Sequence, residues 1–216
     1  MEIMRAKEII NRLLEFQRVN WLPTPIGLYR GLIKTILSQN TNWKNEDIAY
    51  RRLEKMSFNP WSIAESNIED IANAIKPAGM QNKKSKVIVD VSKKIIEKYN
   101  GDLSDIVYKD YTQAREELMK LPGVGKKTAD VVLLFYADKK IIPIDRHIER
   151  ISKRLELVKP NAKYDEIQKI LERAVNDELY LRVHLSLIQF GRDICSAKSP
   201  KCVLCFLNDI CSYPKK

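Results

Sequence analysis

Cysteine is the residue type whose spacing in this chain most directly predicts chemistry. The chain has four, Cys195, Cys202, Cys205 and Cys211, with six, two and five residues between consecutive members. Thiolates gathered in so short a stretch repel one another unless a cation or a cluster lies among them, and a disulfide is disfavoured in an intracellular protein. By ligand count alone, structural zinc and a [4Fe–4S] cluster are both possible, and four unligated buried thiols are the plain alternative. The spacing differs from that of ferredoxins, which argues against electron carriage as the main role.

A second stretch, residues 121–129, reads Leu-Pro-Gly-Val-Gly-Lys-Lys-Thr-Ala and predicts an anion site. Its proline and its glycines, Gly123 and Gly125, favour a tight turn between two helices. A helix N-terminus offers free N–H donors and partial positive charge, and Lys126 and Lys127 add two full charges there. The alternative is a helical hairpin whose glycines serve only the turn.

A third segment, residues 142–148, reads Ile-Pro-Ile-Asp-Arg-His-Ile and places Asp145 where another helix begins. A carboxylate at that position caps the helix by accepting from an N–H group two or three residues further on. Capping and catalysis are compatible roles for one carboxylate. We interpret His147, two residues inside the helix, as a packed and hydrogen-bonded side chain, and we assign His184, in an apolar helix, no role.

In their order along the chain, which is the 121–129 stretch, the Asp145 segment and then the cysteines, the three motifs resemble those of endonuclease III and its relatives among the base-excision DNA glycosylases. The nine-residue stretch is similar to their helix-hairpin-helix element, which grips a DNA phosphate through backbone N–H groups. The segment around Asp145 is similar to their Val-Asp-x-His motif, and the cysteine spacing is that of their iron–sulfur loop. The resemblance covers nearly the whole chain.

The resemblance implies a cofactor and a set of DNA contacts. It favours a [4Fe–4S] cluster over zinc at the four cysteines, and it implies that Gly123, Gly125 and Lys126 contact a DNA phosphate. Lys198 and Lys201 lie between the first two cluster ligands. We expect them to face phosphates, ordinary surface lysines being the alternative.

The resemblance also implies the chemistry. Lys127 falls on the lysine of the members that cleave an abasic strand, and Asp145 on the aspartate that supports base removal. A neutral amine can attack the anomeric carbon and form a Schiff base that permits β-elimination, while a carboxylate stabilises the cationic sugar. The helix N-terminus and Lys126 both disfavour a charged ammonium at Lys127. Without the resemblance, Lys127 would be interpreted as another phosphate contact.

Relatives of other specificity differ at two positions. Adenine-removing members have a glutamate at the position of Lys34 and lack the lysine at the position of Lys127. Thymine-mismatch members have a tyrosine at the latter position. The resemblance therefore implies a bifunctional glycosylase and AP lyase.

Two loops depart from endonuclease III. Residues 38–42 read Ser-Gln-Asn-Thr-Asn where endonuclease III has Ser-Ala-Gln-Ala-Thr-Asp, and residues 79–82 read Gly-Met-Gln-Asn where it has Gly-Leu-Tyr-Asn. In the family these loops fill the gap left by the flipped base and wedge the opposite strand. Asn40, with Gln39 beside it, and Met80 are the candidates here, because an amide can replace lost base-pairing partners and an apolar side chain can fill a stack. Because these residues differ from those of endonuclease III, the sequence does not determine which lesion is recognised. An oxidised pyrimidine is the default substrate, and a mismatch or an alkylated base are the alternatives.

Apolar residues repeat every three or four positions along most of the chain, and no strand-like alternation occurs. We therefore predict an all-α protein, and the proline-rich linker at residues 23–25 and the turn near Asp138 indicate two helical lobes. The resemblance implies that one lobe is a six-helix barrel-like bundle with the hairpin, that the other carries the cluster loop, and that the two flank a DNA-binding cleft. The predicted domains are residues 26–138 and residues 1–25 plus 139–216. The predicted helices cover residues 1–20, 28–38, 43–56, 61–75 (one or two helices), 83–99, 111–120, 126–137, 144–157, 164–175 and 179–191.

Composition agrees with a nucleic-acid partner. Among 216 residues, Lys and Arg number 38 against 28 Asp and Glu, a net charge of +10, and the pI is near 9.3. Such a surplus favours a polyanionic partner, most often nucleic acid, a solvated basic surface being the alternative. The resemblance implies that this partner is double-stranded DNA with a damaged or mismatched base. No 18-residue apolar run and no signal-peptide core occur, so no membrane association is predicted. We expect a monomer in the cytoplasm, associated with the nucleoid.

Two hypotheses of another class keep the hairpin and the cysteines. One is a non-catalytic nucleic-acid-binding module with a structural cluster, and the other is a redox sensor that uses the cluster. Neither needs Lys127 or Asp145, so the presence of both at the positions of the family motifs argues against each.

Overall fold

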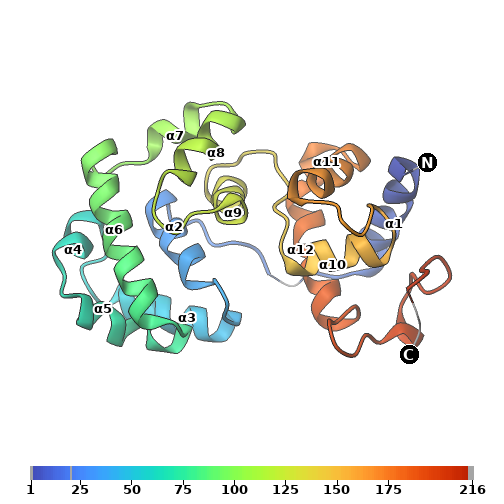
Figure 1. The fold of residues 1–216 in the computed structure, drawn as a ribbon, viewed down its shortest axis with the longest axis horizontal. Coiled ribbons are helices and arrows are strands. Elements are labelled where there is room, and N and C mark those ends of the chain that lie inside the picture. The colour runs from blue at the N-terminus through green and yellow to red at the C-terminus, as the bar shows by residue number, and fades with distance from the viewer. Residues whose placement is uncertain (1, 20, 214–216) are drawn as a thin grey trace. The chain divides into compact units, whose positions relative to one another are not determined.

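The computed structural model describes residues 2–19 and 21–213, and the regular elements within those ranges are all helical (Figure 1). The predicted all-α class is therefore confirmed. The α-helices are α1 (Glu2–Phe16), α2 (Leu28–Leu37), α3 (Trp43–Glu54), α4 (Pro60–Glu65), α5 (Ile68–Ile75), α6 (Gln81–Tyr99), α7 (Ser104–Tyr108), α8 (Tyr111–Met119), α9 (Lys126–Tyr136), α10 (Arg146–Arg154), α11 (Tyr164–Ala174) and α12 (Tyr180–Asp193). Short 3₁₀ helices cover Lys76–Ala78, Asp177–Leu179 and Cys202–Leu204.

The chain folds as two compact units. Unit 1 combines Met1–Pro23 with Lys140–Lys216, and unit 2 is the continuous segment Thr24–Lys139. The hairpin stretch thus belongs to unit 2, whereas Asp145 and the four cysteines belong to unit 1. Among the described residues, no helix is both long and apolar enough to span a membrane.

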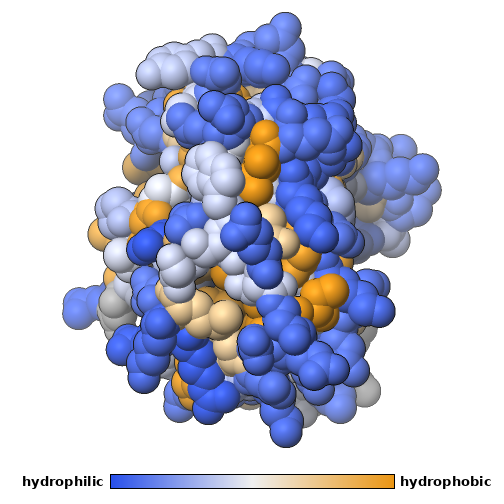
Figure 2. Space-filling model, turned by 90° about the vertical axis from the view of Figure 1, so that its left-hand side faces the viewer, coloured by the Kyte–Doolittle hydropathy of each residue, from blue (hydrophilic) through white to orange (hydrophobic). Residues whose placement is uncertain are grey.

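Unit 2 is built around two helix packings that position the hairpin. The long α6 packs against α4 and α5, and α9 packs against both α2 and α8. Gly31 on α2 permits the close approach of α9, because a Cβ atom there would overlap the ring of Tyr136. The face of the molecule shown in Figure 2, which lies on the side of α4, α5 and α6, is largely hydrophilic with small hydrophobic patches between the polar residues.

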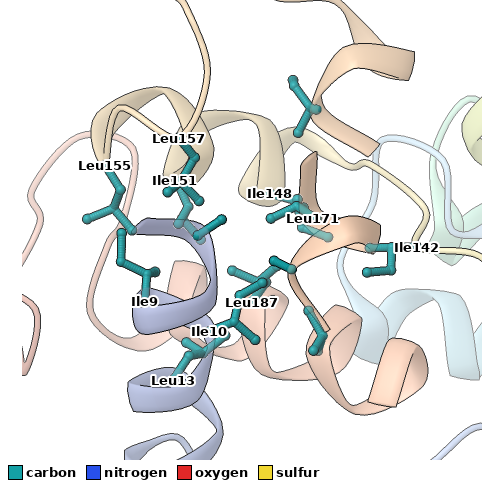
Figure 3. Close-up of a cluster of buried hydrophobic side chains, with 14 of the residues drawn as sticks. Ile9, Ile10, Leu13, Ile142, Ile148, Ile151, Leu155, Leu157, Leu171 and Leu187 are labelled. Carbon is teal, nitrogen blue, oxygen red and sulfur yellow. The ribbon is translucent and has the colours of Figure 1, made fainter. Parts of the chain in front are cut away.

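Unit 1 joins the first helix of the chain to the last three. α1 packs against α11 and α12, and α10 packs against α12. The apolar stripe of α1 enters this core, where Ile9, Ile10 and Leu13 lie with residues of α10, α11 and α12 (Figure 3). The N-terminal helix is therefore an integral part of the unit that carries the cysteines.

Polar side chains begin many of the helices. Asn42, Asn59, Asn67 and Asp110 each accept a hydrogen bond from a backbone N–H group in the first turn of the following helix. Such caps satisfy donors that the helix itself cannot. They explain why these helices begin where they do.

Several predicted helices have different bounds in the structure, among them the first, the one that follows Asp145 and the long α6. The first was predicted to reach Asn20, which lies outside the described residues, and the structure ends α1 at Phe16. The helix predicted over residues 144–157 is shorter, because Asp145 caps α10 and Leu155 ends it. Lys83 was predicted as a helix start, but α6 begins at Gln81, after Met80 in the left-handed region. The helix α7 was not predicted, since its five residues are too short for a periodic pattern.

Candidate functional site

The 121–129 turn connects α8 to α9 and leaves its glycines at the surface. Leu121 and Val124 are buried and anchor the turn, and the Val124 N–H group donates to the Leu121 carbonyl at 3.2 Å. Gly123 has φ 70°, and a Cβ atom there would lie 2.7 Å from Cγ1 of Val87 on α6. Both the conformation and the space therefore require glycine at this position.

Gly125 is the N-cap residue of α9 and has an extended backbone, with φ −98° and ψ 179°. No side chain of the cap residue covers the helix N-terminus, and nothing lies within 4 Å of where a Cβ atom would stand. Lys126, the first residue of the helix, is exposed, and Lys127, the second, is half-buried. The turn thus presents N–H groups and positive charge to an anion approaching over the glycines.

Gln39 links the 38–42 loop to this turn. Its Nε2 atom donates to the carbonyl oxygen of Gly123 at 3.1 Å and to Oγ1 of Thr128 at 3.2 Å. The Gln39 amide, which lies beside the candidate Asn40 in the sequence, is therefore hydrogen-bonded to the hairpin. The residue beside it, Asn40, carries the exposed amide of this loop.

The structure brings Asn40 and Met80 together, although 40 positions separate them in the sequence. Asn40 Nδ2 lies 3.8 Å from the Met80 sulfur. Both residues have positive φ angles, 54° and 52°, in the left-handed region that non-glycine residues rarely adopt. Both side chains are exposed, Met80 to 46%.

Asp145 caps α10 as predicted, and it does so with one oxygen. Its Oδ1 atom accepts from the N–H group of His147 at 2.8 Å and from that of Ile148 at 2.9 Å. The second carboxylate oxygen takes no part in the cap. The cap fixes the side chain of Asp145, a half-buried residue, so that its second carboxylate oxygen is held in a defined place.

His147 is a packed residue, as predicted. Arg150 donates from Nη2 to its Nδ1 atom at 3.1 Å, and a Cβ atom on Gly191 of α12 would lie 2.8 Å from that same nitrogen. Burial lowers the pKa of His147, and the neighbouring Asp145 carboxylate opposes this shift. His184 is buried, with Nδ1 3.0 Å from the Pro143 carbonyl oxygen.

The four cysteines line one cavity in unit 1. The apolar part of the cavity wall includes Leu155, Phe190 and Ile194. Burial and the three other cysteines raise the pKa of the Cys205 thiol, whereas a hydrogen bond from the Leu207 N–H group lowers it. Four thiols around one cavity require a positively charged group if they are to be thiolates.

These residues fit an iron–sulfur cluster. In the described ranges, no three His, Cys, Asp or Glu side chains are grouped to hold one metal ion; the cysteines instead surround a shared cavity. Two N–H groups already point at sulfur, from Arg154 to Cys195 Sγ at 3.4 Å and from Leu207 to Cys205 Sγ at 3.4 Å. N–H donors to sulfur stabilise a thiolate-bound cluster.

Two arginines on α10 hold the first part of the cysteine loop, and sequence reasoning did not find them. Arg150 donates from Nε and Nη2 to the Cys195 carbonyl at 3.1 and 2.8 Å, and from Nη2 to the Gly191 carbonyl at 3.0 Å. Arg154, one turn later, donates to the carbonyls of Ser196 and Ala197 and stacks over the ring of Tyr213. The two arginines lie four positions apart, on one face of the helix that Asp145 caps, and this spacing could have indicated a shared role. Charged residues on one helix face usually contact only solvent, so the spacing alone did not identify them.

Arginines of α1 hold the other end of that loop. Arg12 forms two hydrogen bonds to the carboxylate of Asp209, at 2.9 and 2.8 Å, and donates to the Phe206 carbonyl. Arg5 donates to the Ile210 carbonyl at 3.0 Å. By contrast, Lys198 and Lys201 are exposed on the loop, where they remain available to an anionic partner.

Comparisons with known proteins agree with this arrangement. The HhH-GPD superfamily of base excision DNA repair proteins matches residues 33–177, and the iron–sulfur binding domain of endonuclease III matches residues 195–211. Endonuclease III of Thermotoga maritima is 35% identical over 211 residues, covering 98% of this chain and 92% of the relative.

Two solved structures are also similar. A non-covalent endonuclease III–DNA complex has a TM-score of 0.86 at 28% identity, covering 97% of this chain and 95% of that one. A trapped covalent endonuclease III–DNA intermediate has a TM-score of 0.82 at 29% identity, covering 97% and 94%.

The chain therefore belongs to the HhH-GPD superfamily of base-excision DNA repair proteins. It is an endonuclease III-like DNA glycosylase and AP lyase that binds DNA. Its four C-terminal cysteines carry a [4Fe–4S] cluster, as the family resemblance implied.

Proposed function

We propose that this enzyme removes an oxidised pyrimidine from double-stranded DNA and then cleaves the abasic strand through a Schiff base on Lys127. The observation that carries the proposal is the position of Lys127, half-buried at the second residue of a helix whose N-terminus no cap side chain covers. A phosphate held at that N-terminus would place the neighbouring sugar beside the amine.

In this proposal the reaction has two parts. Loss of the base leaves cationic character on the deoxyribose, which the Asp145 carboxylate stabilises through the oxygen that does not cap α10. The neutral amine of Lys127 bonds to the anomeric carbon as the bond to the base breaks, and the base departs with the electron pair and takes up a proton. The nitrogen of Lys127 then loses a proton, and the C1′–O4′ bond of the aminal breaks while O4′ takes up a proton, which gives a ring-opened imine. This imine makes the adjacent C2′ proton acidic, and loss of that proton expels the 3′ phosphate.

The remaining assignments concern how the duplex is held. Backbone N–H groups at Gly123 and Gly125, with Lys126, grip a phosphate, and Lys198 and Lys201 contact others. Asn40 and Met80 enter the space that the extruded base leaves, while Gln39 holds the loop of Asn40 to the hairpin. The exposure of these lysines and glycines supports these roles.

We further propose that the working enzyme is a monomer in the cytoplasm, associated with the nucleoid. The hairpin segment, residues 26–138, and the cluster segment, residues 1–25 with 139–216, are then its two domains. The cluster supplies a rigid anchor for the loop that carries Lys198 and Lys201.

Reduction by borohydride during the reaction tests the nucleophile. Wild-type enzyme with a duplex containing thymine glycol should form a covalent protein–DNA adduct, which a denaturing gel resolves. Lys127→Gln should form no adduct and cleave no strand, while its affinity for the same duplex stays within about threefold. Lys126→Gln is the matched control: it removes the adjacent charge and should still be trapped.

The other outcomes of this experiment identify other enzymes. Wild-type protein that releases a base without ever being trapped would be monofunctional, which favours a mismatch or alkylated-base glycosylase. A Lys127→Gln protein that is still trapped would show that another amine is the nucleophile.

A further inference from the structure

Unit 2 contains a buried cation that the chemistry above does not use. Lys84, in the first turn of α6, is 4% exposed. Its Nζ atom donates to the carbonyl oxygen of Leu37 at 2.8 Å and to that of Ala78 at 2.9 Å. Burial lowers the pKa of Lys84, and the Glu46 carboxylate opposes the shift. Burial of an ammonium group costs free energy, and hydrogen bonds to the two carbonyl groups are needed to offset that cost.

The two carbonyl groups are the ends of two helices. Leu37 is the last residue of α2, and Ala78 is the last residue of the 3₁₀ helix Lys76–Ala78. Carbonyls in a last helical turn lack partners within the helix and carry partial negative charge, so an ammonium is a suitable cap for both. Lys84 therefore ties together two chain segments that are 41 residues apart, counted from Leu37 to Ala78.

Each of these helix ends leads directly into one of the two DNA-facing loops. Residues 38–42 follow Leu37, and Gly79 and Met80 follow Ala78. Lys84 also holds the second loop through its backbone, because its N–H group donates to the Met80 carbonyl at 2.9 Å. Lys84 thus contacts Leu37 and Ala78, which immediately precede the two loops, and also Met80, which ends the second loop.

The loops need such support because both contain an unfavourable conformation. Asn40 and Met80 have positive φ angles, and their side chains meet at 3.8 Å. Non-glycine residues keep such a conformation only where their surroundings impose it. The contact between the two side chains is lost if either loop moves relative to the other.

We propose that Lys84 is a positioning residue for base extrusion: its ammonium joins the ends of α2 and the 3₁₀ helix and so holds Asn40 and Met80 as one pair ready to enter the duplex. This inference rests on the insertion role proposed for those two residues. It assigns Lys84 no contact with DNA, substrate or reacting atoms.

The first test compares Lys84→Met with wild type. Methionine fills similar space without donors, so the two loops lose their common anchor. Single-turnover release of thymine glycol at saturating enzyme should fall at least tenfold, and the fluorescence rise of a 2-aminopurine placed opposite the lesion should shrink. Affinity for undamaged duplex should stay within about twofold. Lys86→Met, which removes an exposed charge two residues away, should release the base at the wild-type rate.

The second test asks whether Lys84 acts through the paired residues. In an Asn40→Ala, Met80→Ala background, Lys84→Met should cost less than twofold in base release, because the groups that it positions are gone. A full tenfold loss in that background would overturn the inference. Lys84→Arg, which keeps charge and donors, should recover part of the rate. Should Lys84→Met fail to fold, Lys84→Gln, which keeps two N–H donors on a shorter side chain, enters the same comparison.

The outcomes separate this inference from the function on which it rests. If Asn40→Ala with Met80→Ala slows base release but Lys84→Met does not, only the inference fails. If the Asn40 and Met80 changes leave base release unaltered, the insertion role fails and the inference fails with it. Neither result alters the assignment of Lys127, which borohydride trapping tests separately.

Discussion

Asp145 and Arg150 both act on α10: Asp145 caps its first turn from the preceding position, and Arg150, within the helix, donates a hydrogen bond to the carbonyl of Cys195. The helix that presents the candidate catalytic carboxylate is therefore held in place by the backbone of a cluster ligand. Displacement of the cysteine loop would be transmitted to Asp145 through four intervening residues, 146–149.

Loss of the hydrogen bonds from Arg150 should weaken both the retention of the cluster and the rate of base release. Arg150→Met removes charged donors to the partly buried carbonyls of Gly191 and Cys195, and hydrogen bonds from charged groups contribute about 1.5–3 kcal/mol each to stability. We expect a lower melting temperature, faster loss of visible absorbance in the presence of an iron chelator, and slower base release. The control is Lys153→Met, on the same helix, whose ion pair with Glu149 is at the surface and should change stability by less than about 1 kcal/mol. Equal chelator resistance in the two variants would contradict the assigned role of Arg150.

Removing the charge of Asp145 should separate capping from catalysis. Asp145→Asn retains an oxygen that can accept from the N–H groups of His147 and Ile148, so α10 should keep its start. The rate of base release should fall by a factor on the order of 10² or more, because one charge contact to the cationic sugar is lost. Circular dichroism checks the fold, and single-turnover kinetics measures the rate. A variant that releases the base at the wild-type rate would leave Asp145 with its cap alone.

The two glycines of the hairpin should respond differently to alanine. Gly123→Ala places a side chain at φ 70° and against Val87, so unfolding free energy should drop by about 1–3 kcal/mol. Gly125→Ala meets open space in an extended conformation, and a less favourable N-cap costs at most about 1 kcal/mol. Its methyl group nevertheless stands where a phosphate would approach. Urea titration and DNA binding, measured on both, should show a stability defect in the first and chiefly an affinity defect in the second.

Salt dependence should report the phosphate contacts of the cluster loop. The logarithm of affinity for undamaged duplex should fall with the logarithm of salt concentration by roughly 0.9 for each phosphate contacted. Replacing both Lys198 and Lys201 with alanine should flatten that slope, whereas Lys159→Ala, another exposed lysine of unit 1, should leave it unchanged. Identical slopes in all three proteins would show that the two loop lysines do not touch the backbone of DNA.

Iron analysis checks the cofactor quantitatively. Purified protein should be yellow-brown and contain about four iron atoms per chain. Cys205→Ser should lose this iron, because a hydroxyl is a much poorer ligand than a thiolate. A colourless wild-type protein with one zinc ion per chain would contradict the cluster.

The local features of this protein were accessible from sequence because each depends on neighbouring residues. Gly123 and Gly125 predicted the hairpin, Asp145 predicted its own cap, and the helix class followed from apolar spacing. The domain boundaries and the individual catalytic roles stay predictions. The sequence did not predict hydrogen bonds between residues far apart in the chain, such as the one from Arg150 to the carbonyl of Cys195, 45 positions away. The sequence around an arginine does not specify which distant carbonyl accepts its hydrogen bond.

Unit 1 consists of two separate chain segments, so its parts are synthesised at different times. Unit 2 is one continuous segment and can fold as soon as it leaves the ribosome, whereas α1 emerges earlier and must wait for α10, α11 and α12 before its apolar stripe is covered. The partners of Arg5 and Arg12 come last, with the cysteine loop itself. During translation the chain therefore contains a complete unit 2 while unit 1 is incomplete, and the full set of four cluster ligands exists only after Cys211 has been synthesised.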